Sequence, residues 1–248
     1  MEPVLTGDGS PTLWSRKYRE HYHSLSGAFE EARERFVLPC RLPERVVAGG
    51  VRVLDIGFGL GWNLAWALLE ARRAFPEPRL RALSLERDPL PIAILERFLE
   101  HLPDPLPAEA IRELARNGRF ERGGISLQLL EGAAEHTMEK VDEIFDCVFL
   151  DPFSPTRNPE LWTRDFLGRV RCRVAEGGIL STYSAAVGVK VALIEAGWEI
   201  GKGPRVGMKS SGTLASNGPA DPPIPPLAER ELRRLLRKAK AEVDRCDD

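Results

Sequence analysis

The chain has 248 residues and a formal net charge of −2, with 43% hydrophobic and 29% charged residues. These values fit a soluble globular protein with a sizeable core, built as one α/β domain with extensions or at most two small domains. The start carries no secretory signal pattern, no stretch is long and apolar enough for a membrane helix, and the four scattered cysteines indicate neither a disulfide framework nor a zinc site. We therefore expect a cytoplasmic protein.

The N-terminal 45 residues are expected to form a loop followed by a short helix from about Gly27. Beyond them, strands are predicted over 51–57, 79–86, 125–132, 145–151 and 177–184. Helices are predicted over 63–75, 90–102, 133–141, 161–174 and 185–198, with a proline- and charge-rich helical insertion at 103–124. Strands that alternate with helices indicate a Rossmann-like, mostly parallel sheet with helices on both faces. The glycine-punctuated stretch up to Ser216 suits a closing antiparallel hairpin.

The segment "LDIGFGLGWN" (54–63) joins the first strand of this sheet to its helix. Its glycines, Gly57, Gly59 and Gly61, permit positive φ and let the backbone approach a ligand closely. The dinucleotide fingerprint is G-x-G-x-x-G, and here the third glycine comes one residue early, after an acid, Asp55. This favours S-adenosylmethionine (SAM) over a nicotinamide cofactor, because Asp55 can meet the ammonium of the methionine portion while no pyrophosphate needs a cradle. The alternative is a purely structural turn.

Glu86 ends the second strand, where an acid in nucleotide-binding folds accepts hydrogen bonds from ribose hydroxyls. Asn63 is either a ligand contact or a helix-start residue. The complete set of predicted cofactor contacts is Asp55, Gly57, Phe58, Gly59, Gly61, Asn63, Glu86, Arg87 and Gly132.

The segment "FLDPFSPTRNPELW" (149–162) ends the fourth strand on a carboxylate, Asp151. The residue before a proline is pushed into extended geometry, so Pro152 should hold Asp151 in one direction at the strand tip. Ligands of open sheets lie outside the carboxyl ends of the strands. "DPFSP" is similar to the D-P-P-Y type motif of amino-group methyltransferases, in which the acid accepts a hydrogen bond from the target N–H and an aromatic residue, here Phe153, packs on the base. The alternative is a solvated acid that caps a turn.

The residues resemble one known family over about Thr6–Ser216. The stretches "DIGFGLGWN", "SLERDPLP", "FLDPFSPTRNPELW", "GGILSTYSAA" and "IEAGW" are similar to the methyltransferase domain of the bifunctional tRNA 5-methylaminomethyl-2-thiouridine biosynthesis protein. "DGSPTL" and "HYHSLSGAFEEA" resemble the start of its stand-alone relatives. The resemblance implies SAM-dependent methylation of the amine of 5-aminomethyl-(2-thio)uridine at wobble position 34 of tRNA. It also implies Asp151 at the amine and Asp55, Gly57, Gly59 and Glu86 at the cofactor.

Two features depart from that family. The bifunctional protein carries a flavin-dependent oxidase domain for which 248 residues leave no room, so another route would have to supply the aminomethyl group. Ala133 stands where an acid is expected to hold the adenine amino group. Glu131, Glu135 or a backbone carbonyl could take over that contact.

Charge is unevenly distributed along the chain. Residues 86–145 hold thirteen acidic and seven basic residues, a net of −6, whereas residues 157–209 hold nine basic and five acidic residues, a net of +4. A positive stretch can attract a polyanion locally, although solvated helix faces give the same count. The candidates for contacts with RNA phosphates are Arg157, Arg164, Lys190, Lys202, Arg205 and Lys209.

The remaining predictions concern the substrate side of the cleft and the ends of the chain. His21 and His23 are too few for a zinc site, so no metal is expected; with Tyr22 and Ser24 they are expected to close the cofactor cleft. Phe153 and Pro155 complete the predicted substrate contacts. We expect an extension over the cleft (1–45), a SAM-dependent methyltransferase domain (46–216), and a proline linker with a basic helix (217–248). A monomer is favoured, and no membrane contact is expected.

Three functions follow from these patterns. The first is the wobble-uridine amine methyltransferase, the second is SAM-dependent methylation of another exocyclic or small-molecule amine, and the third is a non-catalytic module that binds SAM or RNA. Intact Asp55, Glu86 and Asp151 argue against the third.

Overall fold

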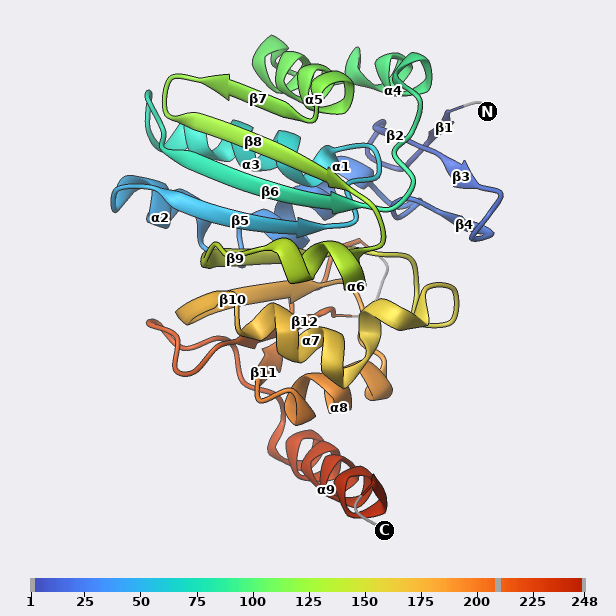
Figure 1. Ribbon diagram of the computed structural model, residues 1–248, viewed down its shortest axis with the longest axis vertical. Coiled ribbons are helices and arrows are strands. Elements are labelled where there is room, and N and C mark those ends of the chain that lie inside the picture. The colour runs from blue at the N-terminus through green and yellow to red at the C-terminus, as the bar shows by residue number, and fades with distance from the viewer. Residues whose placement is uncertain (1–2, 208–210, 247–248) are drawn as a thin grey trace.

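The structure is a computed structural model that describes residues 3–207 and 211–246. These residues form an α/β fold around an eight-stranded sheet, shown in Figure 1, and the predicted fold class is confirmed. The strand order is β11-β12-β10-β9-β5-β6-β8-β7. The parallel strands are β5 (Val51–Ile56), β6 (Leu80–Glu86), β8 (Ile125–Glu131), β9 (Phe145–Leu150) and β10 (Val174–Thr182).

Antiparallel strands close both edges of this sheet. The predicted hairpin is formed by β11 (Glu199–Lys202) and β12 (Thr213–Ser216), and β12 lies between β10 and β11. The other edge carries β7 (Arg119–Arg122), which the sequence prediction placed in a helical insertion. Only α5 (Pro105–Asn117) of that insertion is helical, because Gly118 ends it in a left-handed conformation with φ of +71°.

Two apolar cores cover the two faces of the sheet. The strands alternate their side chains between them: Val53 of β5 packs into one core and Leu54 into the other. The first core lies under α1 (Ala28–Glu31), α2 (Leu42–Val47), α3 (Trp62–Ala74), α4 (Ile92–Leu99) and α5. The second lies under α6 (Ala134–Thr137), α7 (Arg164–Arg171) and α8 (Val187–Glu195). In Figure 1, α6 and α7 lie in front of the sheet and α3 behind it.

The N-terminal segment contains more regular structure than the predicted loop. Two small antiparallel sheets precede the first helix, one formed by β1 (Val4–Leu5) and β2 (Pro11–Thr12), the other by β3 (Trp14–Ser15) and β4 (Glu20–His21). The helix α1 begins after Gly27, as predicted, and continues as a π-helical segment, η1 (Ala32–Val37). The chain thus runs from β3 and β4, beside the carboxyl ends of the parallel strands, to α2 at their amino ends (Figure 1).

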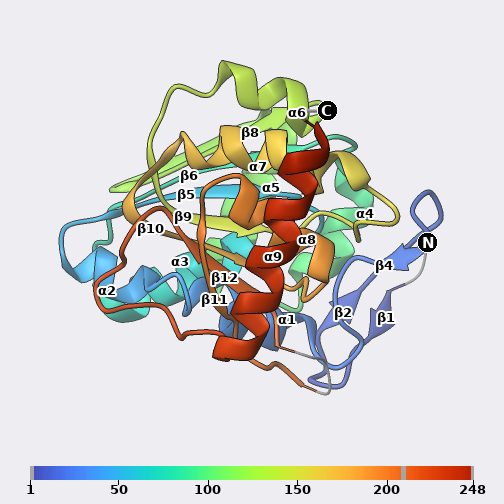
Figure 2. The ribbon, with the colours of Figure 1, turned by 90° about the horizontal axis from the view of Figure 1, so that it is seen from below.

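The C-terminal helix α9 (Glu229–Cys246) lies outside the sheet layers. Its buried Leu235 and Ala239 pack with Val191 of α8, and Lys190 of α8 pairs with Glu231 at 2.6 Å. Figure 2 shows α9 lying across α8 at the end of the molecule. Two single turns of 3₁₀-helix, η2 (Met138–Lys140) and η3 (Pro159–Trp162), complete the elements. None of the helices in the described ranges is both long enough and apolar enough to cross a membrane.

Candidate functional site

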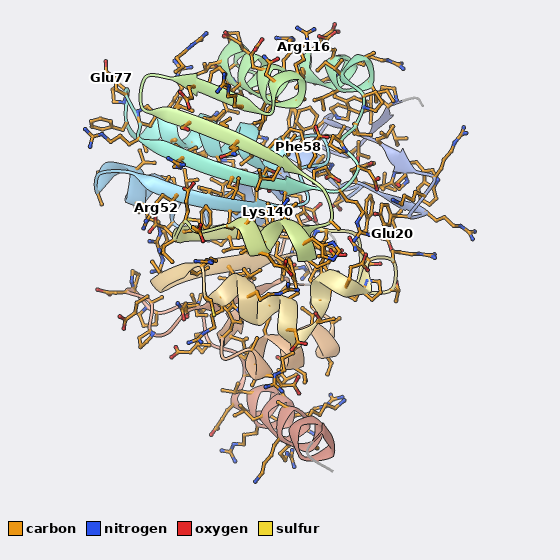
Figure 3. The ribbon with its side chains drawn as sticks, in the orientation of Figure 1. Glu20, Arg52, Phe58, Glu77, Arg116 and Lys140 are labelled. Atoms are coloured by element: carbon orange, nitrogen blue, oxygen red, sulfur yellow. The ribbon has the colours of Figure 1, made fainter. Side chains whose placement is uncertain are left out.

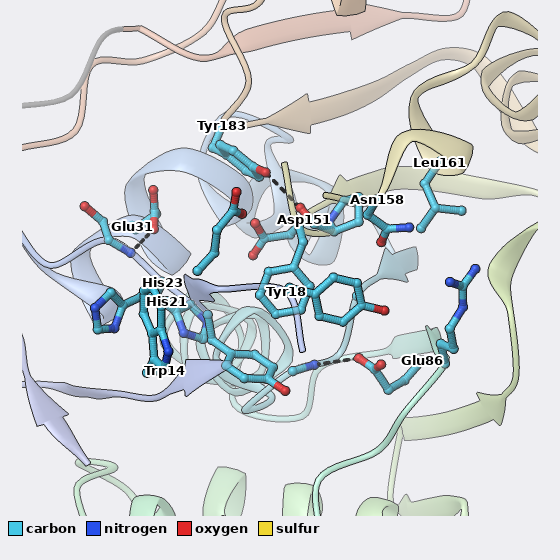
Figure 4. A pocket seen from close by; sticks show the side chains of 18 of the residues that line it. Trp14, Tyr18, His21, His23, Glu31, Glu86, Asp151, Asn158, Leu161 and Tyr183 are labelled. Carbon is cyan, nitrogen blue, oxygen red and sulfur yellow. Dashed lines mark hydrogen bonds between the residues drawn. The ribbon is translucent and has the colours of Figure 1, made fainter. Parts of the chain in front are cut away.

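A cavity of about 590 Å³ opens at the carboxyl ends of the parallel strands. The order of the sheet reverses between β5 and β9, whose register pairs Ile56 with Leu150, so the chain segments after these two strands diverge from one point. Ligands of open α/β sheets bind at such a switch point. The glycine turn 57–61 follows β5 at this point, and Asp151 follows β9. Figure 4 shows the side chains that line the cavity.

The glycine turn forms the floor of the cavity. Gly57 has φ of +97°, and a Cβ on it would lie 2.7 Å from the backbone oxygen of Asp151. Gly59 has φ of +54°, and a Cβ there would lie 3.1 Å from the ring of Tyr22. Only glycine fits both positions without displacing a neighbour. The floor is therefore bare backbone held close to the space that a ligand would fill.

Glu86 lines the cavity at the tip of β6. One carboxylate oxygen accepts a hydrogen bond from the backbone N–H of Gly59 at 3.1 Å (dashed in Figure 4), and the other accepts one from the N–H of Asp88 at 3.0 Å. A carboxylate offers about four acceptor positions, so two remain for hydroxyl groups of a ligand. The backbone N–H groups of Gly59 and Asp88 thus fix this carboxylate at the position where the sequence predicted a ribose contact.

Asp55 lies beneath the cavity and does not line it. Its side chain is 1% exposed and Oδ2 accepts a hydrogen bond from the Ser84 hydroxyl at 2.6 Å. Burial raises the pKa of Asp55 to about 7, because water no longer stabilises the charged form. Oδ1 has no hydrogen-bond partner in the described part of the chain, so the group has acceptor capacity for a cation that comes close.

Asp151 lines the cavity at the tip of β9. The side-chain amide of Asn63 donates to Oδ2 of Asp151 at 2.9 Å, so Asn63, in the first turn of α3, holds this carboxylate. The hydroxyl of Tyr183 donates to the carbonyl oxygen of Pro152 at 2.9 Å, also dashed in Figure 4. The indole N–H of Trp162 donates to the carbonyl oxygen of Phe153 at 3.0 Å. Side chains from η3 and from the end of β10 thus fix the turn that begins at Pro152.

An aromatic cluster stands beside Asp151. The ring of Tyr18 stacks on Phe153 with centroids 4.1 Å apart, and Tyr22 meets Phe153 edge-on at 5.1 Å. Burial raises the pKa of Tyr22 to about 12, so its phenol stays protonated. The cluster gives an aromatic surface next to a fixed carboxylate, which suits a planar base that bears an amine.

The N-terminal segment supplies the opposite wall of the cavity. Glu31 accepts a hydrogen bond from the N–H of Ser24 at 2.8 Å and lies 3.5 Å from Nε of the buried Arg35. Burial lowers the pKa of this guanidinium. This ion pair lies within the N-terminal segment. The segment is joined to the sheet domain by the Ser181 hydroxyl, which donates to the carbonyl oxygen of Arg35, and by the Trp62 indole N–H, which donates to the carbonyl oxygen of Pro11 at 3.1 Å. Residues of this segment that line the cavity are Trp14, Tyr18, Arg19, Glu20, His21, Tyr22, His23, Ser24, Leu25, Ser26 and Glu31.

The structure gathers only part of the predicted site around the cavity. The predicted residues that line it are Gly57, Gly59, Glu86, Arg87, Asp151, Phe153, Tyr22 and Ser24. Phe58 packs in the core and Gly61 begins α3, so both shape the turn from behind. Gly132 donates its N–H to the carbonyl oxygen of Glu86 at 2.8 Å and does not line the cavity. Arg87 pairs with Glu135 and Glu160.

The predicted phosphate contacts lie at different places. Arg157 and Arg205 are exposed, and Pro155 is half-buried outside the cavity lining. Lys190 is 8% exposed and paired with Glu231 of α9, so its charge is already neutralised and it is no candidate for a phosphate. Lys209 lies outside the described residues. Among the described residues, no three His, Cys, Asp or Glu side chains gather as a metal ion would need.

Several cavity residues were missed by sequence reasoning. Asn158 and Leu161 lie inside the quoted "FLDPFSPTRNPELW", and Tyr183 lies inside "GGILSTYSAA". Tyr18 follows a basic pair, Arg16 and Lys17, in a segment expected to be a loop. Proximity to a motif was the only available signal. Two glutamates were expected as possible contacts for the adenine amino group. Glu131 is exposed outside the cavity lining and Glu135 is paired with Arg87, whereas the neighbouring Ala134 lines the cavity.

A family model described as S-adenosyl-L-methionine-dependent methyltransferase matches residues 95–218. The bifunctional protein MnmC of Cupriavidus metallidurans, named for tRNA 5-methylaminomethyl-2-thiouridine biosynthesis, is 36% identical over 88% of this chain and 34% of its own length. That of Ralstonia nicotianae is 32% identical over 90% of this chain and 36% of its own length. The chain thus spans about a third of the length of these relatives.

Among solved structures, MnmC2 from Aquifex aeolicus is similar over nearly the whole chain. It is 38% identical, the TM-score is 0.81, and the match covers 95% of this chain and 75% of that one.

Proposed function

The chain belongs to the S-adenosyl-L-methionine-dependent methyltransferase family, with MnmC2 of Aquifex aeolicus as a relative, and on that premise we propose that it acts on tRNA. Its substrate would be the amine of 5-aminomethyl-(2-thio)uridine at wobble position 34, and its product 5-methylaminomethyl-(2-thio)uridine. The names of the MnmC relatives support the substrate class. The observation that carries the proposal is Asp151, fixed by Asn63 on the cavity wall beside the ring of Phe153.

The residues of the cavity fit the cofactor of the family. Gly57 and Gly59 line the cavity with backbone, and Glu86 keeps two acceptor positions for ribose hydroxyls. Asp55 would hold the charge of the methionine ammonium from beneath the floor. A nearby cation favours the ionised carboxylate, which would lower the pKa that burial has raised.

When bound, SAM supplies a methyl group on sulfonium sulfur, so that one nitrogen–carbon bond forms as one sulfur–carbon bond breaks. The task left to the chain is to orient a neutral nitrogen. Model alkyl amines titrate near ~10.4, so the attacking amine must lose a proton at neutral pH. Asp151 accepts the hydrogen bond of the amine N–H, directs the lone pair and receives the proton, directly or through water. Proximity and orientation of this kind can supply ~7–11 kcal/mol.

The aromatic cluster would hold the base that carries this amine. Phe153 stacks on Tyr18 and makes a T-shaped contact with Tyr22, so a pyrimidine that packs in this cluster would bring its 5-substituent close to Asp151. Nucleobases that enzymes modify are read by stacking between aromatic and apolar side chains in this way.

The proposal is tested by incubating the protein with SAM and tRNA that carries 5-aminomethyl-2-thiouridine, followed by nucleoside mass spectrometry. We expect conversion to 5-methylaminomethyl-2-thiouridine. Unmodified tRNA and free alkyl amines are the controls, and we expect neither to be methylated. Methylation of the free amines with no change in the tRNA would replace the proposal by a small-molecule methyltransferase. Calorimetry should show binding of SAM and none of NAD.

A further inference from the structure

We propose that the hairpin of residues 14–21, formed by β3, β4 and the turn between them, is the element that docks the tRNA strand beside the modified uridine. This inference rests on the proposed function, since it names how the same site would hold its RNA. Two of its arginines would contact phosphates, and Trp14 would stack on a neighbouring base.

The hairpin concentrates the side chains that bind single-stranded RNA. Its sequence, "WSRKYREH", places Arg16, Lys17 and Arg19 in the turn, with Trp14 and Tyr18 between and before them. The turn is closed by a hydrogen bond from the N–H of Arg19 to the carbonyl oxygen of Ser15 at 2.8 Å, and Arg19 has φ of +55°. Basic side chains that follow the backbone and aromatic rings that stack on bases are how proteins hold single strands.

The hairpin spans the mouth of the cavity from one side to the other. On the side of Asp151, Glu20 accepts a hydrogen bond from the N–H of Ser154 at 3.1 Å and Tyr18 stacks on Phe153. On the side of Glu86, Lys17 forms a salt bridge with Asp88. The hairpin is thus attached both to the loop that holds the proposed catalytic acid and to the turn that holds the proposed ribose contact.

The charges of the turn are available for phosphates. Arg16 and Arg19 are exposed, and neither forms a salt bridge with any residue in the described part of the chain. Arg157, across the mouth, is also exposed and lies 3.9 Å from a carboxylate oxygen of Glu20. Lys17 pairs with Asp88 and Arg157 with Glu20, so Arg16 and Arg19 remain without an acidic partner in the described part of the chain. Positive charge therefore faces outward at the mouth although the protein as a whole is slightly acidic.

Trp14 offers an aromatic surface at the same place. It is 42% exposed, and its ring meets His21 edge-on with centroids 4.9 Å apart, so one side is held and the rest faces solvent. Single exposed aromatic residues are common on protein surfaces, so it is the position of Trp14, beside the exposed Arg16 and Arg19, that makes it a candidate for stacking. The indole lies on the cavity lining, within reach of nucleotides that flank a base inserted beside Asp151.

The basic helix α9 provides the competing surface and a matched control. Six basic residues from Arg230 to Lys240 are exposed on its outer face, yet α9 lies below α8, at the opposite end of the molecule from β7 and outside the layers that form the cavity, as Figure 1 shows. We place the docking element at the hairpin because, of these two basic surfaces, it is the hairpin that is continuous with the cavity.

The test compares two double variants that each remove two positive charges: Arg16→Ala with Arg19→Ala on the hairpin, and Arg234→Ala with Arg237→Ala on α9. Affinity for aminomethyl-uridine tRNA is measured by fluorescence anisotropy over a series of salt concentrations. Each lost phosphate contact removes about 0.7–0.9 from the slope of log K against log salt, so the hairpin variant should lose about 1.4–1.8. The α9 variant should keep the wild-type slope.

A second pair of variants tests the stacking. Trp14→Phe should keep the tRNA affinity within about threefold, whereas Trp14→Ala should weaken it about five- to a hundredfold, the range for one stacked base. SAM affinity and melting temperature, measured on every variant, should match wild type. An unchanged slope in the hairpin variant, or an equal loss in the α9 variant, would overturn the inference. If wild-type protein neither binds nor methylates this tRNA, it is the proposed function that fails.

Discussion

The two walls of the cavity differ in how they are built. One consists of the tips of β5, β6 and β9, where buried strands end in Gly57, Glu86 and Asp151. The other is the N-terminal segment, whose strands are two residues long and which is attached to the sheet domain by side-chain hydrogen bonds and a surface salt bridge. Side chains on a rigid sheet are placed more precisely than side chains on loops. The difference suggests that the strand-tip wall carries the chemistry and the N-terminal wall selects the substrate.

The largest expected effect lies in the strand-tip wall. Asp151→Asn keeps the shape and an acceptor for the Asn63 amide but removes the negative charge, so turnover should fall about 10²–10⁴-fold, the range for a positioned acid or base. SAM affinity should change little. Single-turnover assays with saturating SAM give the rate. If Glu20→Gln, on the opposite wall, lowers the chemical rate as much as Asp151→Asn, the chemistry is not confined to the strand-tip wall.

Glu86→Gln should act on the cofactor instead of the chemical step. Hydrogen bonds to charged groups contribute about 1.5–3 kcal/mol, so SAM affinity should fall about ten- to a hundredfold, with turnover at saturating SAM nearly unchanged. Calorimetry measures the affinity. Glu131→Gln is the matched control, because Glu131 pairs with Glu86 in the register of β8 and β6 but is exposed outside the cavity lining. An equal loss of SAM affinity in both variants would contradict the assignment of Glu86 as the ribose contact.

Asp55 should make stability depend on pH. Burial raises its pKa to about 7 in the folded state, whereas an unfolded chain releases this proton near ~3.9. The folded state therefore binds the extra proton between about pH 4 and 7, and stability falls as pH rises through this window. Asp55→Asn keeps an acceptor for Ser84 but has no carboxyl to titrate, so its stability should not fall in this window. The free energy of unfolding of wild type, minus that of the variant, should therefore decrease by up to about 1.4 kcal/mol for each pH unit.

Chemical denaturation at several pH values measures this difference. Glu77→Gln provides the control, since Glu77 is exposed near the amino ends of the strands, on the side away from Glu20 in Figure 3. Its pH dependence should follow that of wild type. A constant offset between wild type and Asp55→Asn from pH 5 to pH 8 would show that the buried carboxyl does not titrate there.

Tyr183→Phe should have the smallest effect. It removes the hydrogen bond to the carbonyl oxygen of Pro152 and leaves the ring in place, which costs about 1 kcal/mol. If this bond orients Asp151, turnover should fall about fivefold with SAM affinity unchanged. A lowered melting temperature with normal turnover would make Tyr183 a stabilising residue only.

The strand-tip wall could be predicted from the sequence because it is local. Apolar runs followed by glycine or by Asp-Pro mark strand ends, and the parallel arrangement brings those ends to one edge of the sheet. Asp55, Glu86 and Asp151 were placed at strand tips in this way. The short edge strand β7 was missed because only Phe120 of its four residues is buried, so no alternating pattern marks it.

The N-terminal segment was predicted to close the cleft, but the contacts that attach its hairpin could not be predicted because they are long-range. Glu20 bonds to Ser154, 134 residues further along the chain, and Lys17 pairs with Asp88, 71 residues away. Arg35 is fully buried although its sequence neighbourhood is that of an ordinary charged helix. Pairings between residues so far apart in the sequence leave no periodic pattern from which they could be predicted. Only the structure showed that the hairpin spans the cavity mouth.

The central claim is that Asp151 acts on the amine, and its pH–rate profile tests this most directly. Single-turnover methylation of aminomethyl-uridine tRNA would be measured from pH 6 to pH 10 for wild type and Asp151→Asn, with SAM saturating. The neutral fraction of a free alkyl amine rises about tenfold per pH unit below ~10.4, so the ratio of the variant's rate to the wild-type rate should increase as pH rises. A ratio that stays constant across this range, or equal rates throughout, would contradict the assignment.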